Sequence, residues 1–168
     1  MTSSELRRRI RILLLIFISG LVVAGATAIP LETEVKLLFR IVQAGSAGAH
    51  APPGLVRWLT IVHDGLIATN AKYPFIGYGT DWLAFGHFVI AIAFIGPLRD
   101  PVKNIWVIEF GMIACALVVP FAFGMGAVRG IPLGWRLIDC SFGLLGIIPL
   151  WLCRKDIQQL AKLEADRP

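Results

Sequence analysis

Hydrophobic residues gather in four long runs along this chain. The runs cover residues 12–29, 82–98, 104–126 and 133–153, and few charged residues interrupt them. A bilayer core of about 30 Å requires about 20 mostly apolar residues in a helix. Lipid offers no hydrogen-bond partner to the backbone, so a segment that crosses it must be helical. The pattern therefore predicts an all-α, polytopic membrane protein with four transmembrane helices.

Residues 30–80 form a long segment between the first and second runs. Apolar residues recur at helical spacing from Pro30 to Gln43 and again from Leu55 to Ala68. Neither stretch is long or apolar enough to cross a bilayer. We expect two short amphipathic helices on the membrane face or over the mouth of the bundle, with a flexible break at residues 45–54. The tail, residues 154–168, is expected to extend the fourth helix.

The basic residues predict the orientation of the chain. Ten of the 16 Lys and Arg residues fall in short segments on one side of the predicted spans. They are Arg7, Arg8, Arg9, Arg11, Arg99, Lys103, Arg154, Lys155, Lys162 and Arg167. The positive-inside rule then places both termini in the cytoplasm of a bacterium and residues 30–80 outside its inner membrane. The basic start and Ala26-Thr27-Ala28 also fit a signal peptide, and that alternative equally leaves residue 30 outside.

Composition supports a single membrane domain over residues 1–168. Apolar residues make up 57% of the chain and charged residues 16%, against about 45–50% and about 25% in soluble domains. The net charge of +5 does not indicate nucleic-acid binding, because the basic residues flank apolar runs. The three cysteines lie in or beside those runs without metal-ligand spacing. We expect no metal and no cofactor.

Five polar residues are candidates for a binding site. Asp81 and His87 lie at or in the second run, Arg136 and Asp139 lie in the fourth, and Arg129 precedes it. Charges in a bilayer are costly unless they are paired or hydrated, so they often mark functional sites. Arginine binds phosphate through two parallel hydrogen bonds. These residues predict an outward-facing polar pocket that binds an anionic headgroup.

Each candidate also has a structural interpretation. Asp81 would cap its helix together with Thr80, and His87 would make a structural hydrogen bond. Arg136 precedes Asp139 by three residues, so the two share a helix face and would form an ion pair that fixes the helix end.

Glu109 and the pair His63-Asp64 are further polar groups of the chain. Glu109, near the cytoplasmic end of its run, is expected to pair with Arg99 or Lys103. His63 and Asp64 are adjacent in the chain. Neighbouring residues of a helix do not face each other, so we expect no dyad from this pair alone.

Residues 81–152 resemble the VanZ-like family of small bacterial membrane proteins. The resemblance rests on the segment from Asp81 to Phe88, with its His87-Phe88 pair, and on Arg136-Leu137-Ile138-Asp139 followed by Gly143 and Gly146. The chain departs from the family pattern at two places. The family has a Glu/Gln pair shortly before the arginine, whereas Glu109 here is single and lies earlier. The family has an Asn just after the aspartate, whereas this chain has Cys140. Membership would imply a cell-envelope protein linked to glycopeptide resistance, and the family has no settled chemistry.

The leading functional prediction is a small inner-membrane protein that binds an anionic lipid or an envelope-precursor headgroup. If it catalysed a reaction, His87 would act as the general acid and base, because histidine titrates near neutrality. The alternative is a non-catalytic accessory or scaffold subunit that binds a partner protein through its outer segment or helix faces. Ion transport would need a polar line from Asp139 to Glu109, and the apolar stretch between them argues against it.

Overall fold

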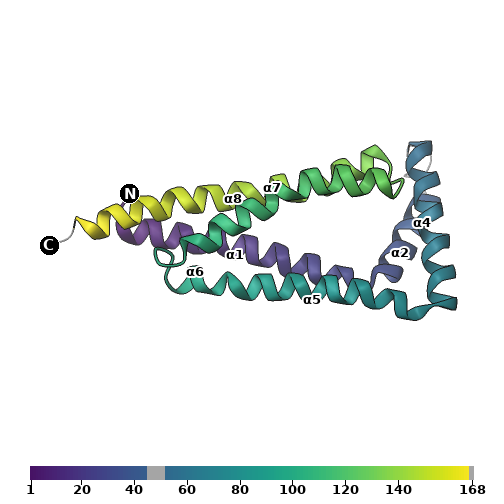
Figure 1. Ribbon diagram of the computed structural model, residues 1–168, viewed down its shortest axis with the longest axis horizontal. Helices are drawn as coiled ribbons and strands as arrows, with labels where there is room; N and C mark the ends of the chain where they lie inside the picture. The colour runs from purple at the N-terminus through teal and green to yellow at the C-terminus, as the bar shows by residue number, and fades with distance from the viewer. Residues whose placement is uncertain (45–51, 167–168) are drawn as a thin grey trace. The chain divides into compact units, whose positions relative to one another are not determined.

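The computed structural model describes residues 1–44 and 52–166, and the elements in these ranges are helices (Figure 1). Four segments are long and apolar enough to cross a membrane. They are α1 (Ser3–Ala28), the stretch Pro74–Arg99, α7 (Ile105–Val128) and α8 (Leu133–Ala165). For the described residues, the prediction of an all-α fold with four helices apolar and long enough to cross a membrane is confirmed.

The helices extend beyond the apolar runs. α1 begins at Ser3, so the basic arm before residue 12 is helical. α8 continues to Ala165, as the sequence predicted, and its 33 residues span about 50 Å. α8 is therefore longer than a hydrocarbon core of about 30 Å is thick.

The candidate span Pro74–Arg99 begins before the predicted run at residues 82–98 and consists of three consecutive helices. They are η1 (Pro74–Gly77), α5 (Tyr78–Ala93) and α6 (Ile95–Arg99). The interruption at Phe94 precedes Pro97, which has no N–H to donate to the carbonyl of Ala93.

The chain divides into two compact units. Unit 1 comprises residues 1–21 and 89–168, and unit 2 comprises residues 22–88. The single membrane domain over residues 1–168 stays a prediction.

In unit 1, α7 and α8 lie side by side, and glycines permit their close approach (Figure 1). A Cβ added at Gly143 would clash with the backbone carbonyl oxygen of Cys115. One added at Gly146 would come within 2.9 Å of the Cys115 sulfur. The absence of a side chain at Gly143 and Gly146 therefore permits the close packing of α7 and α8.

The buried core of unit 1 is formed by α1, α7, α8 and Phe94. Its members are Leu6, Ile10, Leu14, Phe94, Val107, Ile108, Leu150, Cys153, Ile157 and Leu160. Ile157 and Leu160 belong to the tail beyond residue 153, so the tail docks on the N-terminal part of α1 through apolar side chains. The rings of Phe17 and Phe94 meet beside this core, with centroids 4.7 Å apart.

In unit 2, α2 (Leu31–Ala44) packs against α4 (Pro53–Lys72). The carboxylate of Glu32 accepts hydrogen bonds from Asn70 and Lys36, each at 2.5 Å. These hydrogen bonds hold the pKa of Glu32 below its usual value, and the bond from Asn70 has the larger effect. α4 is longer than the predicted helix from Leu55 to Ala68. Most of the break predicted at residues 45–54 lies outside the described residues, as does Arg167.

Candidate functional site

Asp81 lies in the first turn of α5, within unit 2. Because α5 begins at Tyr78, Asp81 does not cap the helix, and the capping prediction is wrong. The hydroxyl of Thr80 instead donates to the carbonyl of Gly77 at 2.6 Å. Asp81 is exposed and makes no hydrogen bond or ion pair with any described residue.

His87 also lies on α5 in unit 2, against the last turns of α1. Its Nδ1 donates to the carbonyl of Leu83 at 2.8 Å, so Nδ1 carries a proton. A Cβ added at Gly25 of α1 would come within 3.0 Å of the His87 Cβ. His87 therefore makes the structural hydrogen bond that the sequence offered as one interpretation.

Arg136 lies on α8, where it closes the turn that follows α7. Its Nε donates to the carbonyl of Ile131 at 2.7 Å. Its side-chain stem lies over Gly126, where an added Cβ would come within 2.8 Å of Cγ and Cδ. Its two terminal amino groups have no hydrogen-bond partner in the described part of the chain.

The end of α7 explains why a backbone carbonyl faces Arg136. Gly130 has a φ of 67°, which glycine adopts without steric cost. The N–H of Ile131 donates to the carbonyl of Gly126 at 2.8 Å, and that of Gly130 donates to Ala127 at 3.2 Å. This is a Schellman motif, and it reverses the chain so that the Ile131 carbonyl lies within reach of α8.

Asp139 and Arg129 complete the polar groups of the α7–α8 turn. Asp139 is half-buried, Arg129 is exposed, and neither has a partner among residues 1–44 and 52–166. The predicted ion pair between Arg136 and Asp139 does not form, because the guanidinium is bonded to Ile131 instead. Unit 1 thus brings Arg129, Arg136 and Asp139 to one turn, whereas Asp81 and His87 belong to unit 2.

At the other end of the α7–α8 hairpin, charged side chains form ion pairs. Oε1 of Glu109 accepts from Nε of Arg154 at 2.9 Å. The predicted partner, Arg99 or Lys103, is wrong, because Glu109 faces α8. Two pairs that the sequence did not predict join α1 to the tail of α8: Arg9 with Asp156 at 3.1 Å and Arg7 with Glu164 at 2.5 Å.

His63 and Asp64 form a contact that the helical-spacing argument missed. Nδ1 of His63 donates to Oδ1 of Asp64 at 2.9 Å. The His63 ring stacks on Phe39 of α2, with centroids 4.1 Å apart. Side-chain rotation brings the adjacent groups together although their Cβ atoms diverge.

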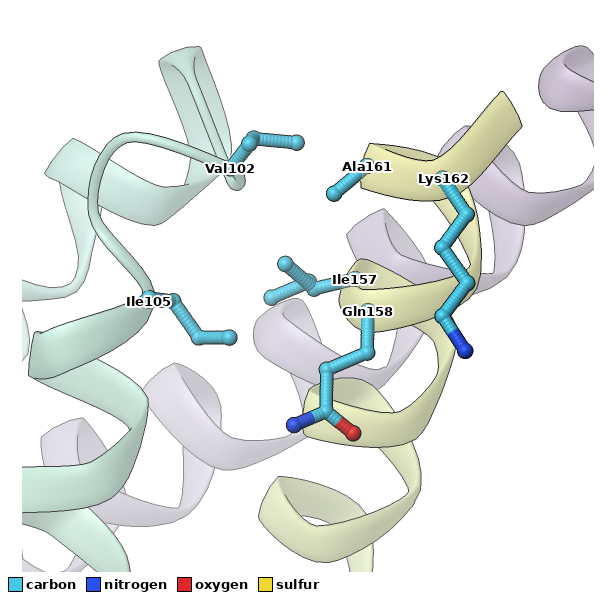
Figure 2. Close-up of a pocket in the computed structure, with 6 residues that line it drawn as sticks. All are labelled: Val102, Ile105, Ile157, Gln158, Ala161 and Lys162. Atoms are coloured by element: carbon cyan, nitrogen blue, oxygen red, sulfur yellow. The ribbon is translucent and has the colours of Figure 1, made fainter. Parts of the chain in front are cut away.

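Two surface hollows lie among the described residues of unit 1. The larger, about 430 Å³, has an apolar floor with Gln158 and Lys162 at its edge (Figure 2). Its lining residues are Val102, Ile105, Ile157, Gln158, Ala161 and Lys162. The smaller, about 290 Å³, lies on α1 and is lined by Glu5, Arg8, Arg9, Ile12 and Leu13. Neither includes a residue of the predicted site, and no described His, Cys, Asp and Glu residues cluster as a metal site would require.

No protein-family model, curated protein or solved structure is significantly similar to this chain. The resemblance to the VanZ-like family therefore stays a prediction. Function must be inferred from the geometry of the chain itself.

Proposed function

We propose that this chain is a bacterial inner-membrane protein that binds the phosphate of an anionic lipid or envelope-precursor headgroup at the α7–α8 turn. The observation that carries the proposal is the state of Arg136. Its Nε is held by the Ile131 carbonyl at 2.7 Å, while both terminal amino groups are without a partner in the described residues. A fixed guanidinium with free donors suits bidentate binding of phosphate.

The neighbouring charges define the headgroup further. Arg129 follows the last turn of α7 and adds a second positive charge at the same turn. Asp139 follows Arg136 by one helical turn and offers a carboxylate to a hydroxyl or amino group of the headgroup. The proposed site consists of residues of unit 1 alone.

The proposed orientation places this turn outside the inner membrane, with both termini in the cytoplasm. In the same proposal, α2 and α4 are amphipathic helices on the outer membrane face, and α2 exposes Leu37, Leu38 and Ile41 for insertion. A cysteine introduced at Leu133 should react with an impermeant maleimide in intact cells, and one at Lys162 should not. The reverse pattern would overturn the orientation.

Retention of lipid by the purified protein tests the proposal. Protein extracted in mild detergent is titrated with an anionic phospholipid, and bound lipid is counted by native mass spectrometry. Arg136→Gln should weaken binding about tenfold or more, since hydrogen bonds to charged groups contribute about 1.5–3 kcal/mol. Arg136→Lys should bind at an intermediate level.

The matched control is Arg57→Gln on α4, which removes an exposed arginine that also has no partner among the described residues. It should bind as the wild type does. Equal lipid binding by Arg136→Gln and the wild type would refute the proposed site.

A second candidate function is an accessory or scaffold subunit. An exposed aromatic row on α5 favours it: Tyr78, Trp82 and Phe85 meet edge to face, with centroids 6.0 and 5.5 Å apart. Such a row suits a neighbouring transmembrane helix as well as lipid. A second polypeptide that co-purifies with the wild type, is lost in Trp82→Ala and is kept in Arg136→Gln would favour this function.

A further inference from the structure

The smaller hollow on α1 combines charged and apolar side chains in the order in which a phospholipid presents its parts. Glu5, Arg8 and Arg9 form its polar side, and Ile12 and Leu13 form its apolar side. Residue 12 is also where the first apolar run begins. The hollow therefore lies where the headgroups of one leaflet meet the hydrocarbon.

The guanidinium of Arg9 is held in place by the buried carboxylate of Asp156. Its Nε lies 3.1 Å from Oδ2 of Asp156, whose side chain is 8% exposed. The Arg9 side chain is still 44% exposed, and among the described residues Nη1 contacts only the thioether of Met1, at 3.8 Å. Most of its donor capacity therefore remains available on the side of the hollow.

Arg8 differs from Arg7 in having no partner in the described part of the chain. Arg7 is bound to Glu164 of α8 at 2.5 Å and is not free to bind a ligand. Arg8 is exposed and contributes an unpaired guanidinium to the hollow. The two arginines that line the hollow thus offer donors for one phosphate.

Glu5 is fixed by the start of α1. The N–H of Thr2 donates to Oε2 of Glu5 at 2.7 Å, and the N–H of Glu5 donates to the Thr2 hydroxyl at 3.3 Å. This reciprocal pair is a capping box. Oε1 of Glu5 has no partner among the described residues, so it is an acceptor available to a ligand.

The hollow presents charges of both signs. Arg8 and Arg9 line it together with the carboxylate of Glu5, on which the N-terminal ammonium also acts, and Asp156 lies beneath Arg9. A purely anionic headgroup would be repelled by that carboxylate. A zwitterionic headgroup with a phosphate and a hydrogen-bond-donating ammonium matches both signs.

We propose that this hollow binds a phosphoethanolamine headgroup. The phosphate binds Arg8 and Arg9, the primary ammonium donates to Oε1 of Glu5, and an acyl chain lies over Ile12 and the exposed Ile16. A quaternary ammonium has no N–H to donate, so the carboxylate distinguishes ethanolamine from choline headgroups. The site is separate from Arg136.

Lipid titration of the full-length protein tests this site. Delipidated protein is titrated with phosphatidylethanolamine, phosphatidylcholine and phosphatidylglycerol of identical acyl chains, and native mass spectrometry gives each affinity. The ethanolamine lipid should bind about tenfold more tightly than the choline lipid. Glu5→Gln should abolish that preference, and Arg8→Gln should weaken binding of both lipids.

Two controls separate this site from other effects. Glutamine also closes a capping box, so Glu5→Gln keeps the helix start. Arg11→Gln removes an exposed arginine of α1 that does not line the hollow and should leave the series unchanged. Arg136→Gln should also keep the ethanolamine preference, so failure of the outer site is distinguishable. Equal affinities for the ethanolamine and choline lipids in the wild type, or an ethanolamine preference that survives in Glu5→Gln, would overturn the proposal.

Discussion

The two ends of the α7–α8 hairpin differ in whether their charged side chains form ion pairs. Where α7 begins and the tail of α8 follows, Glu109 is paired with Arg154 and Asp156 with Arg9. Where α7 turns into α8, Arg129, Arg136 and Asp139 have no charged partner in the described part of the chain. The first end uses charge to join helices, whereas the second leaves charge available to a ligand.

Under the proposed function, this difference separates charged residues that join helices from charged residues that bind a ligand. A charge near lipid is stabilised by another side chain, by water or by a bound group. At the paired end, the chain itself supplies the counter-charge. At the turn, the described residues supply a backbone carbonyl and no counter-charge to Arg136, and an external phosphate would complete the coordination.

The largest expected effect comes from breaking the hairpin on which both ends depend. Gly143→Leu would force a side chain against the backbone of Cys115, which cannot move as a flexible side chain would. We expect a loss of about 3 kcal/mol in the free energy of unfolding. Denaturant titration of the purified protein in detergent measures it.

Gly124→Leu is the control, because no atom lies within 4 Å of a Cβ added at Gly124. Similar unfolding midpoints for the two variants would show that α7 and α8 do not pack as described.

Removing one partner of the most buried ion pair should have the next largest effect. The Asp156 side chain is 8% exposed and Arg9 is 44% exposed, so Asp156→Ala should cost about 1–3 kcal/mol after allowance for solvent screening. Glu164→Ala, at the more exposed pair with Arg7, should cost less than about 1 kcal/mol. A double-mutant cycle with Arg9→Gln checks the coupling, and equal costs for the two variants would contradict the assigned burial.

Exchanging arginine for glutamine at each end should separate stability from lipid binding. Arg154→Gln removes the pair with Glu109, and Arg136→Gln removes the bond to Ile131, so each should cost about 1 kcal/mol or less. Only Arg136→Gln should lose anionic lipid. If Arg154→Gln lost lipid equally, the contrast between the two ends would not hold.

The smallest expected effect is a pH dependence at the paired end. The backbone N–H of Lys103 donates to Asp100 at 3.1 Å, which lowers the pKa of Asp100 from its usual 3.8. The resulting stabilisation is complete above the usual pKa and is lost as the pH falls through the lowered value. Unfolding midpoints measured from about pH 5 to about pH 2 should fall more steeply for wild type than for Asp100→Asn. Identical pH profiles would rule out a contribution from Asp100.

The four long apolar helices could be predicted from sequence because a long apolar run has few alternatives to a helix in lipid. Gly143 and Gly146 suit helix packing for a similarly simple reason, since only small residues allow close approach. The extension of α1 to Ser3 was not predicted, because the arginines before residue 12 interrupt the apolar pattern without opposing helix formation.

The partners of the polar residues could not be predicted in the same way. Glu109 bonds to Arg154, 45 residues away, and that pairing depends on which faces of α7 and α8 meet. Spacing alone allowed Arg136 to reach Asp139. Arg136 instead donates to the carbonyl of Ile131, because the positive φ of Gly130 turns the chain and brings that carbonyl within reach.

Photo-crosslinking tests the proposed headgroup site most directly. The protein is reconstituted with an anionic phospholipid that carries a photoreactive headgroup, and the modified peptide is identified by mass spectrometry. We expect modification between Arg129 and Arg136, competed by unlabelled anionic phospholipid and lost in Arg136→Gln. Modification elsewhere alone, or modification of this turn that persists in Arg136→Gln, would contradict a headgroup site at the α7–α8 turn.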